Sequence, residues 1–307
     1  MRGRHPPARP DRRHRAGSRS GDPRTLRPAR SHRAPGLLRD AQARHHPAAA
    51  RRHGGGDAAP LGERGRDRRD HGRALGLHSR SDRRLRAVFV TGTDTGCGKT
   101  TFACALARSA REAGRRVRIL KPIETGCERG VPADALALAR AAGDDAPVER
   151  LCPVRLALPA APECAARAEG VAIELAPIEA AFARAKVDAD LTIVEGAGGL
   201  LVPITPALDM AGLAGRLRLP LVVVARAALG TINHTLLTVE AAGARGLRVV
   251  GVVIDHGCAD LSAADRRNLD LLIERLPVPL LCELAFGATR LPASFDLAAF
   301  LASAGNS

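Results

Sequence analysis

A lysine and a threonine that could hold phosphate follow a short apolar run near residue 90. Residues 88–100 are Val-Phe-Val-Thr-Gly-Thr-Asp-Thr-Gly-Cys-Gly-Lys-Thr. A glycine-containing turn between a strand and a helix presents backbone N–H groups at the positive end of the helix dipole, which suits phosphate oxygens. Lys99 adds a positive charge, and the Thr100 hydroxyl could bind Mg²⁺. The segment predicts a phosphate-binding loop, although Thr93 stands where the strict pattern has glycine.

Two acids and a second lysine could complete a nucleotide site. Glu195 follows the apolar run 191–194, and a carboxylate at the end of a buried strand is costly unless it is paired or bound to a metal. Asp134 opens the Ala- and Leu-rich segment 133–142, where an acid could equally be a plain helix cap. Lys121 closes another apolar run, and a lysine there suits the stabilisation of charge on a transferring phosphoryl group.

The elements that must position these residues alternate along the chain. Strands are expected at 88–90, 116–120, 191–194, 221–224, 249–254 and 279–281, and helices at 100–113, 133–142, 178–185, 232–244 and 263–275. This order predicts an α/β fold, a doubly wound and mostly parallel sheet with helices on both faces. Together with the phosphate-binding loop at Lys99, it indicates the P-loop NTPase type. Ligands bind such sheets at the carboxyl ends of the strands, where these motifs fall. No element is assigned to residues 143–170, which are rich in Pro and Ala.

Composition divides the chain near residue 86. Residues 1–86 contain 24 Arg, no Lys and 8 Asp or Glu, so this segment carries the basicity behind the formal net charge of +15. It has too little apolar surface to offset its ordering entropy and is expected to be a disordered extension. Arginine without lysine is also what a GC-rich reading frame yields upstream of the true start, so the extension could be non-native. An Arg-rich segment could attract nucleic acid, but nucleic acid is not the partner we expect.

Residues 87–307 are expected to form one compact domain. No apolar run approaches the roughly 20 residues that span a bilayer, and no signal segment opens the chain, so a cytoplasmic protein without membrane attachment is expected. The seven cysteines are dispersed and contain no Cys-x-x-Cys pair. This pattern favours reduced packing residues over a zinc or redox site.

Five motifs in one order resemble the dethiobiotin synthetase family. They are T-G-T-D-T-x-x-G-K-T at 91–100, K-P-I-E-T-G at 121–126, D-A-L-A-L at 134–138, V-E-G-A-G-G at 194–199 and L-G-T-I-N-H at 229–234. The resemblance implies an ATP- and Mg²⁺-dependent carbon–nitrogen cyclo-ligase of biotin biosynthesis that acts as a homodimer. In that family CO₂ carboxylates one amine of 7,8-diaminopelargonate, ATP phosphorylates the carbamate, and the second amine displaces phosphate to close the ureido ring.

The resemblance also assigns roles to residues of this chain. Lys99 and Lys121 would be catalytic, and Lys121 would stabilise the carbamate and the migrating phosphoryl group. Mg²⁺ would lie among Thr100, Asp134 and Glu195. The nucleotide would be held by Thr95, Gly96, Cys97, Gly98, Lys99, Thr100, Thr101, Asp134, Glu195, Gly196, Ala197, Gly198, Asp255 and Phe286, and the diamine by Thr125, Gly230, Thr231 and Asn233. The last three would act across a dimer interface, although Asn233 could also be a helix cap.

The chain departs from the family pattern at four positions. Glu163 stands where His is expected, Gly96 where an acid is frequent, Asp255 where Asn is expected and Ala285 where Pro is usual. The diamine motifs are unaffected, and the departures concern mainly the nucleobase.

Three other interpretations compete with this one. A partitioning or septum-site ATPase would carry a lysine where this chain has Asp94. A cobyrinate-type amidoligase would need room for a glutaminase domain, and a nucleic-acid-binding protein would depend on the Arg-rich extension.

Overall fold

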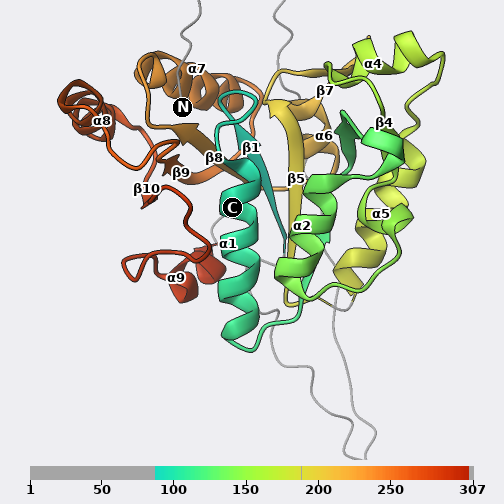
Figure 1. The fold of residues 1–307 in the computed structure, drawn as a ribbon, viewed down its shortest axis with the longest axis horizontal. Coiled ribbons are helices and arrows are strands. Elements are labelled where there is room, and N and C mark those ends of the chain that lie inside the picture. Colours follow the sequence, from blue (N-terminus) through green and yellow to red (C-terminus); the bar gives the residue numbers. More distant parts are fainter. Residues whose placement is uncertain (1–86, 188, 304–307) are drawn as a thin grey trace, which may run out of the picture. The chain divides into compact units, whose positions relative to one another are not determined.

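A six-stranded parallel sheet forms the centre of the described residues, 87–187 and 189–303, in this computed structural model (Figure 1). Its strand order is β10-β9-β8-β1-β5-β2, and every neighbouring pair is parallel. The strands are β1 (Ala87–Gly92), β2 (Val117–Leu120), β5 (Leu191–Gly199), β8 (Leu221–Arg226), β9 (Val249–Asp255) and β10 (Leu280–Leu284). The predicted α/β fold with a mostly parallel sheet is confirmed. The predictions for residues 1–86 lie outside the described residues.

Two small strand pairs accompany the main sheet. β3 (Ile123–Thr125) pairs in parallel with β4 (Val154–Leu156), and β6 (Pro203–Thr205) pairs antiparallel with β7 (Leu208–Asp209). Strand β3 begins two residues after Lys121. Its pairing with β4 therefore fixes the backbone of Ile123–Thr125 in the K-P-I-E-T-G motif.

Helices fill the connections between the strands. They are α1 (Lys99–Glu112), α2 (Ala133–Ala142), α3 (Val148–Leu151), α4 (Pro162–Glu169), α5 (Leu175–Val187), α6 (Met210–Arg216), α7 (Thr231–Ala244), α8 (Ala263–Arg275) and α9 (Leu297–Ala302), with a 3₁₀ turn η1 (Glu128–Gly130). All five predicted helices are present, with ends that differ by a few residues. In the described part of the chain, none of them is both long enough and apolar enough to cross a membrane.

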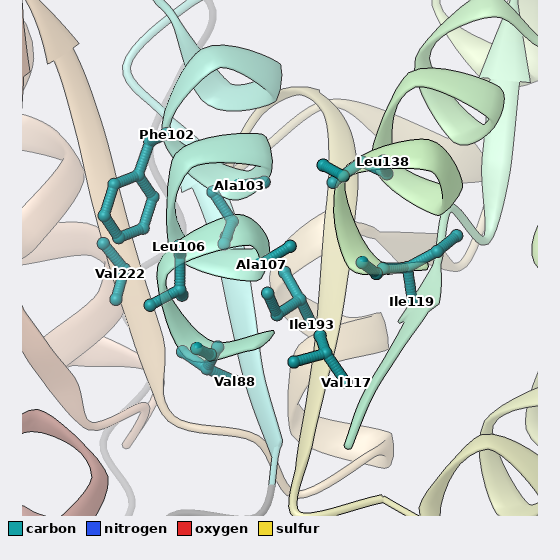
Figure 2. Close-up of a cluster of buried hydrophobic side chains, with 14 of the residues drawn as sticks. Val88, Phe102, Ala103, Leu106, Ala107, Val117, Ile119, Leu138, Ile193 and Val222 are labelled. Carbon is teal, nitrogen blue, oxygen red and sulfur yellow. The ribbon is translucent and has the colours of Figure 1, made fainter. Parts of the chain in front are cut away.

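Alternating side chains of β1 build separate cores on the two faces of the sheet. Val88 and Val90 pack with Phe102 and Leu106 of α1 in one buried cluster, and Figure 2 shows α1 lying over the sheet beside α2. Phe89 points to the opposite face and packs with residues of α5 and α6. Successive strand residues face opposite sides, and residues four apart in a helix share one face, so this sequence pattern produces a sheet covered on both sides.

Strand β5 is longer than its apolar run predicts, which corrects the expectation that Glu195 ends the strand. The strand runs through the glycine-rich segment to Gly199, which pairs with Gly92 of β1 after a register shift. Glycine also lets this part of β5 pack closely against β1, because a Cβ atom at Gly196 would lie 2.8 Å from the Phe89 ring. Glu195 consequently lies within a rigid strand, and its side chain is fully buried.

Residues 143–170, which had no assigned element, contain α3, β4 and α4. Buried Asp144 ties the start of this segment to β2, because its carboxylate accepts hydrogen bonds from the Ile119 amide at 3.0 Å and from Arg118 at 2.7 Å.

Candidate nucleotide-binding and catalytic site

The loop between β1 and α1 has the geometry of a phosphate-binding loop. Gly98 precedes the first residue of α1 with φ +98°, in the left-handed region that favours glycine. A Cβ atom there would lie 2.4 Å from Asp255 Cγ, so the loop packs directly against the end of β9. Lys99 is largely buried, and its Nζ donates to the Asp94 carbonyl at 2.8 Å, which folds the loop around the lysine.

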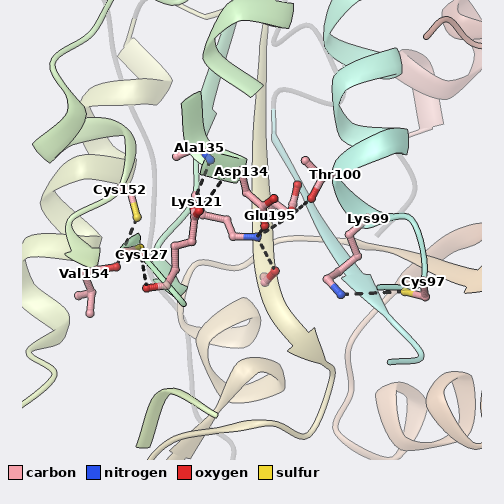
Figure 3. A network of polar contacts seen from close by, with 12 residues as sticks. Cys97, Lys99, Thr100, Lys121, Cys127, Asp134, Ala135, Cys152, Val154 and Glu195 are labelled. Carbon is pink, nitrogen blue, oxygen red and sulfur yellow. Dashed lines mark hydrogen bonds and ion pairs between the residues drawn. The ribbon is translucent and has the colours of Figure 1, made fainter. Parts of the chain in front are cut away.

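Lys121 occupies the centre of a buried charge cluster. Its Nζ donates to Asp134 Oδ2 at 2.9 Å and to Glu195 Oε1 at 2.5 Å (Figure 3). Burial alone disfavours the ammonium form, but the two carboxylates outweigh burial and raise the pKa of Lys121 above its ordinary value. The lysine is therefore charged at neutral pH and joins the end of β2 to β5 and α2.

Glu195 links this cluster to the phosphate-binding loop. Its Oε1 also accepts a hydrogen bond from Thr100 Oγ1 at 2.9 Å. Its Oε2 is buried and has no hydrogen-bond partner within the described residues. A buried carboxylate oxygen without a partner is costly, and it is relieved by a cation. Thr100, Asp134 and Glu195 thus offer the oxygen ligands that Mg²⁺ prefers.

A cavity of about 840 Å³ lies at the carboxyl ends of the strands and collects most of the predicted residues. Its lining includes Thr95, Gly96, Gly98, Lys99, Thr100, Thr101, Lys121, Thr125, Asp134, Ala197, Gly198, Asp255 and Phe286. Residues from six separate places in the sequence therefore meet at one opening.

Three predicted residues of the nucleotide site lie behind the cavity wall. Cys97 is buried, and its Sγ donates to the Val224 carbonyl of β8 at 3.2 Å, so this side chain packs into the sheet. Glu195 does not line the cavity, but its Oε1 accepts hydrogen bonds from Thr100 and Lys121, which do. The Gly196 carbonyl lies 3.5 Å from Lys121 Nζ. These residues support the wall with their side chains or backbone.

The structure does not bring Gly230, Thr231 and Asn233 to this cavity. Gly230 and Asn233 line a separate cavity of about 490 Å³ between α7 and α8, and the two cavities share no lining residue. Thr231 is buried, with its Oγ1 3.5 Å from that of Thr235. Within one chain, the predicted diamine residues therefore fall into two groups, with Thr125 in one and the α7 residues in the other.

Sequence reasoning missed several residues of the cavity wall. Glu124 lies between the two predicted residues Lys121 and Thr125 and is almost fully buried. Its place inside the K-P-I-E-T-G motif, between two predicted residues, would have been a usable signal. His256 lines the cavity next to Asp255, and its Nε2 lies 2.7 Å from Glu283 Oε2. The segment 159–162 also contributes, and its Pro-Ala-Ala-Pro sequence contains no polar side chain that could have indicated this.

Burial changes the acidity of two cavity carboxyl groups. Burial raises the pKa of Glu124, although the amides of Asp134 and Ala135 act in the opposite direction. Burial also raises the pKa of Asp255, which His256 partly offsets. Both groups are thus more easily protonated than a carboxyl group in water.

The strand, the glycine loop and the helix that begins at Lys99 define a P-loop nucleotide-binding protein. A family model described as an AAA domain matches residues 86–288. The ATP-dependent dethiobiotin synthetase BioD of Anaeromyxobacter dehalogenans strain 2CP-C is 49% identical over 204 residues, which cover 64% of this chain and 90% of that protein. The protein of the same name from Aromatoleum aromaticum is 44% identical over 64% of this chain and 88% of its own length. The chain belongs to the ATP-dependent dethiobiotin synthetase family, which confirms the resemblance carried by its motifs.

Among solved structures, chloroplast FtsY from Physcomitrella patens matches with a TM-score of 0.40 and 16% sequence identity, over 72% of this chain and 65% of that one.

Proposed function

We propose that the protein is a dethiobiotin synthase, which forms the ureido ring of dethiobiotin from 7,8-diaminopelargonate, CO₂ and ATP. The observation that carries this proposal is the meeting of Lys99 and Thr100 with Lys121 and Asp134 around one cavity, in a chain of this family. The phosphate-binding loop holds a phosphoryl donor, and the second lysine provides positive charge where an oxyanion would react.

The nucleotide and Mg²⁺ fit the same side of the cavity. The amides of residues 96–101 and Lys99 would bind the triphosphate. Asp255 lies where the loop meets the end of β9, and Phe286 lines the same cavity. Thr100, Asp134 and Glu195 would hold Mg²⁺, for which the unpartnered Glu195 Oε2 is a suitable ligand. When bound, Mg²⁺ would neutralise charge on the phosphate oxygens.

Lys121 and Thr125 would act on the diamine. In the reaction, one amine attacks CO₂ and loses a proton to give a carbamate, the carbamate oxygen takes the γ-phosphoryl group from ATP, and the second amine displaces phosphate. Lys121 would stabilise the negative charge on the carbamate and on the migrating phosphoryl group. Since the protein contributes little covalent chemistry, the rate would depend on positioning and electrostatics.

A second copy of the chain would complete the site. Leu229 and Leu237 are 86% and 56% exposed beside Gly230 and Asn233, so an apolar surface surrounds the second cavity. Covering it with a partner subunit would bury these leucines, and the partner's cavity at Thr125 would then receive the α7 residues. A cytoplasmic location, and a catalytic unit made of residues 87–307, are part of the same proposal.

The proposal is tested by omitting one component at a time. Purified protein with ATP, Mg²⁺, bicarbonate and 7,8-diaminopelargonate should release phosphate and form dethiobiotin, measured by mass spectrometry, only when all four are present. Phosphate release that does not depend on the diamine would contradict the proposal and favour a simple ATPase.

The partitioning-ATPase alternative is disfavoured by Asp94. The Asp94 side chain accepts a hydrogen bond from the Thr95 amide at 2.7 Å, so it shapes its own loop. It offers no positive charge to a nucleotide, as the signature lysine of those ATPases would.

A further inference from the structure

Glu124 holds the first turn of helix α2 from a neighbouring strand. Its Oε1 accepts the Asp134 amide at 2.9 Å and its Oε2 accepts the Ala135 amide at 3.0 Å. The first amides of a helix have no partner inside the helix and are usually satisfied by a capping side chain. The residue before α2 is Pro132, which makes no side-chain cap. Glu124, which precedes Asp134 by ten positions, therefore supplies the cap.

The same contact sets the place of a functional carboxylate. Asp134 is the second residue of α2, and its Oδ2 accepts a hydrogen bond from Lys121 Nζ at 2.9 Å. Glu124 accepts a hydrogen bond from the backbone amide of Asp134, while Lys121 donates one to its side chain. Since Lys121 and Glu124 are both close to the start of β3, one short segment fixes Asp134 at two points.

Glu124 itself is committed to these amides. Its side chain lines the cavity, but only 6% of the residue is exposed, and each carboxylate oxygen already accepts one N–H group. A carboxylate that binds backbone amides from the wall of a site acts on a ligand by orienting its neighbours. The negative charge and both oxygens are needed, because two donors converge on it.

We infer that Glu124 is a positioning residue, which fixes the Asp134 carboxylate for the metal–nucleotide complex by anchoring the start of α2. The inference rests on the proposed function for the choice of reaction, and on the geometry alone for the binding of a metal–nucleotide complex by this P-loop site.

The test compares Glu124→Gln and Glu124→Ala with a control variant, Asp144→Asn. The glutamine keeps the size of the side chain but replaces one acceptor oxygen with a group that cannot accept an N–H bond. Asp144 resembles Glu124 in that it is buried and accepts the Ile119 and Ala146 amides at 3.0 and 3.2 Å, but it also pairs with Arg118 at 2.7 Å and does not line the cavity. The probe is Mn²⁺ with a non-hydrolysable ATP analogue, and Mn²⁺ binding is followed by electron paramagnetic resonance.

All three variants should melt at lower temperatures than the natural protein. Only the Glu124 variants should weaken Mn²⁺ binding, by about 10- to 100-fold, the range found when a group that orients a metal ligand is removed. Their kcat should fall as well, while the Michaelis constant of the diamine changes little. Mn²⁺ affinity in Glu124→Gln within about twofold of the natural protein would overturn the inference and leave Glu124 as a structural cap.

Two further results keep the inference decisive. If the Glu124 variants do not fold, hydrogen exchange in the natural protein should show the Asp134 and Ala135 amides protected relative to that of Ala133, and rapid exchange of both would overturn the inference. If the natural protein makes no dethiobiotin, the proposed function fails, while the Mn²⁺ comparison still decides the role of Glu124.

Discussion

Lys121 Nζ lies 2.5 Å from Glu195 Oε1, and both residues are buried, with Lys121 lining the cavity and Glu195 behind its wall. The same ammonium lies 2.9 Å from Asp134 Oδ2, so it bridges two carboxylates that are candidate Mg²⁺ ligands. This side chain compensates buried negative charge, and in the proposed reaction it would also provide positive charge for the phosphoryl group.

Replacing Lys121 by methionine should destabilise the protein in buffer without divalent cations. The change leaves fully buried Glu195 without its cation, and breaking a buried pair costs about 3–5 kcal/mol. Added Mg²⁺ should raise the melting temperature of the variant more than that of the natural protein, because a bound cation replaces the missing charge. Calorimetry with EDTA or Mg²⁺ measures both effects.

Lys186→Met is the matched control for this experiment. Lys186 is exposed, and its Nζ lies 5.1 Å from the centre of the Phe182 ring. Its loss should change stability by less than about 1 kcal/mol. The interpretation of Lys121 fails if both variants melt at the same temperature in EDTA.

Gly98→Ala should abolish nucleotide binding. An alanine at φ +98° is strained, and its Cβ would also overlap the Asp255 side chain, which lies at 2.4 Å. Gly114→Ala provides the comparison, because Gly114 has φ +76° but its Cβ would meet nothing within 4 Å. Gly114→Ala should cost only the backbone strain of about 1–2 kcal/mol and leave nucleotide affinity unchanged. Titration with a fluorescent ATP analogue separates the two variants, and equal affinities would contradict the predicted clash.

Asp255→Asn should sharpen the preference for ATP over GTP. An asparagine amide matches the N7 acceptor and N6 donor of adenine, whereas an ionised aspartate only accepts and could instead bind N1–H and N2–H₂ of guanine. We expect GTP to support the natural enzyme within about tenfold of ATP, by analogy with base contacts worth about 1–3 kcal/mol. Specificity constants for both nucleotides decide this, and strong ATP selectivity that the substitution leaves unchanged would disprove it.

The selectivity of the natural enzyme should also depend on pH. Because burial raises the pKa of Asp255, lowering the pH should protonate it sooner than an ordinary carboxyl group. The neutral acid can donate to adenine N7, so the ATP-to-GTP ratio of specificity constants should rise as the pH falls through that pKa. The ratio should stay level in Asp255→Asn, which has no carboxyl group to titrate at this position.

Mixing two impaired variants, Lys121→Ala and Asn233→Ala, should restore activity if the site spans two subunits. Lys121→Ala removes the lysine that we propose to be catalytic from the first cavity, and Asn233→Ala alters the second. Hybrid dimers would contain one site built from the two unaltered halves, so up to about one quarter of the natural activity should return for random exchange. The same experiment with Lys121→Ala and Lys99→Ala is the control, because those residues share one cavity and every hybrid site lacks one of them.

The two variants should affect different kinetic constants. Asn233→Ala should raise the Michaelis constant of the diamine and spare ATP binding, whereas Lys121→Ala should lower turnover more than nucleotide affinity. If mixing restores nothing although subunit exchange is demonstrated, each site is contained in one chain.

The features that the sequence alone determined are those that depend on local patterns. Alternating apolar runs and helical segments depend on neighbours close in the chain, so the order of strands and helices and the loop at Lys99 were predictable. The five motifs identified the family because their order and spacing can be read directly from the linear sequence. The end of β5 was not predictable, since a glycine-rich segment resembles a loop until Phe89 lies against Gly196 and β1 pairs with Gly199.

Only the tertiary structure decided which charges meet. Lys121 and Glu195 are 74 positions apart, and their contact depends on β2 and β5 being neighbours in the sheet. The capping of α2 by Glu124 could not be predicted from the sequence, because it depends on how β3 packs against the start of that helix. The separation of Asn233 from Lys121 likewise follows from the strand order, which places α7 beside α8 and away from β2.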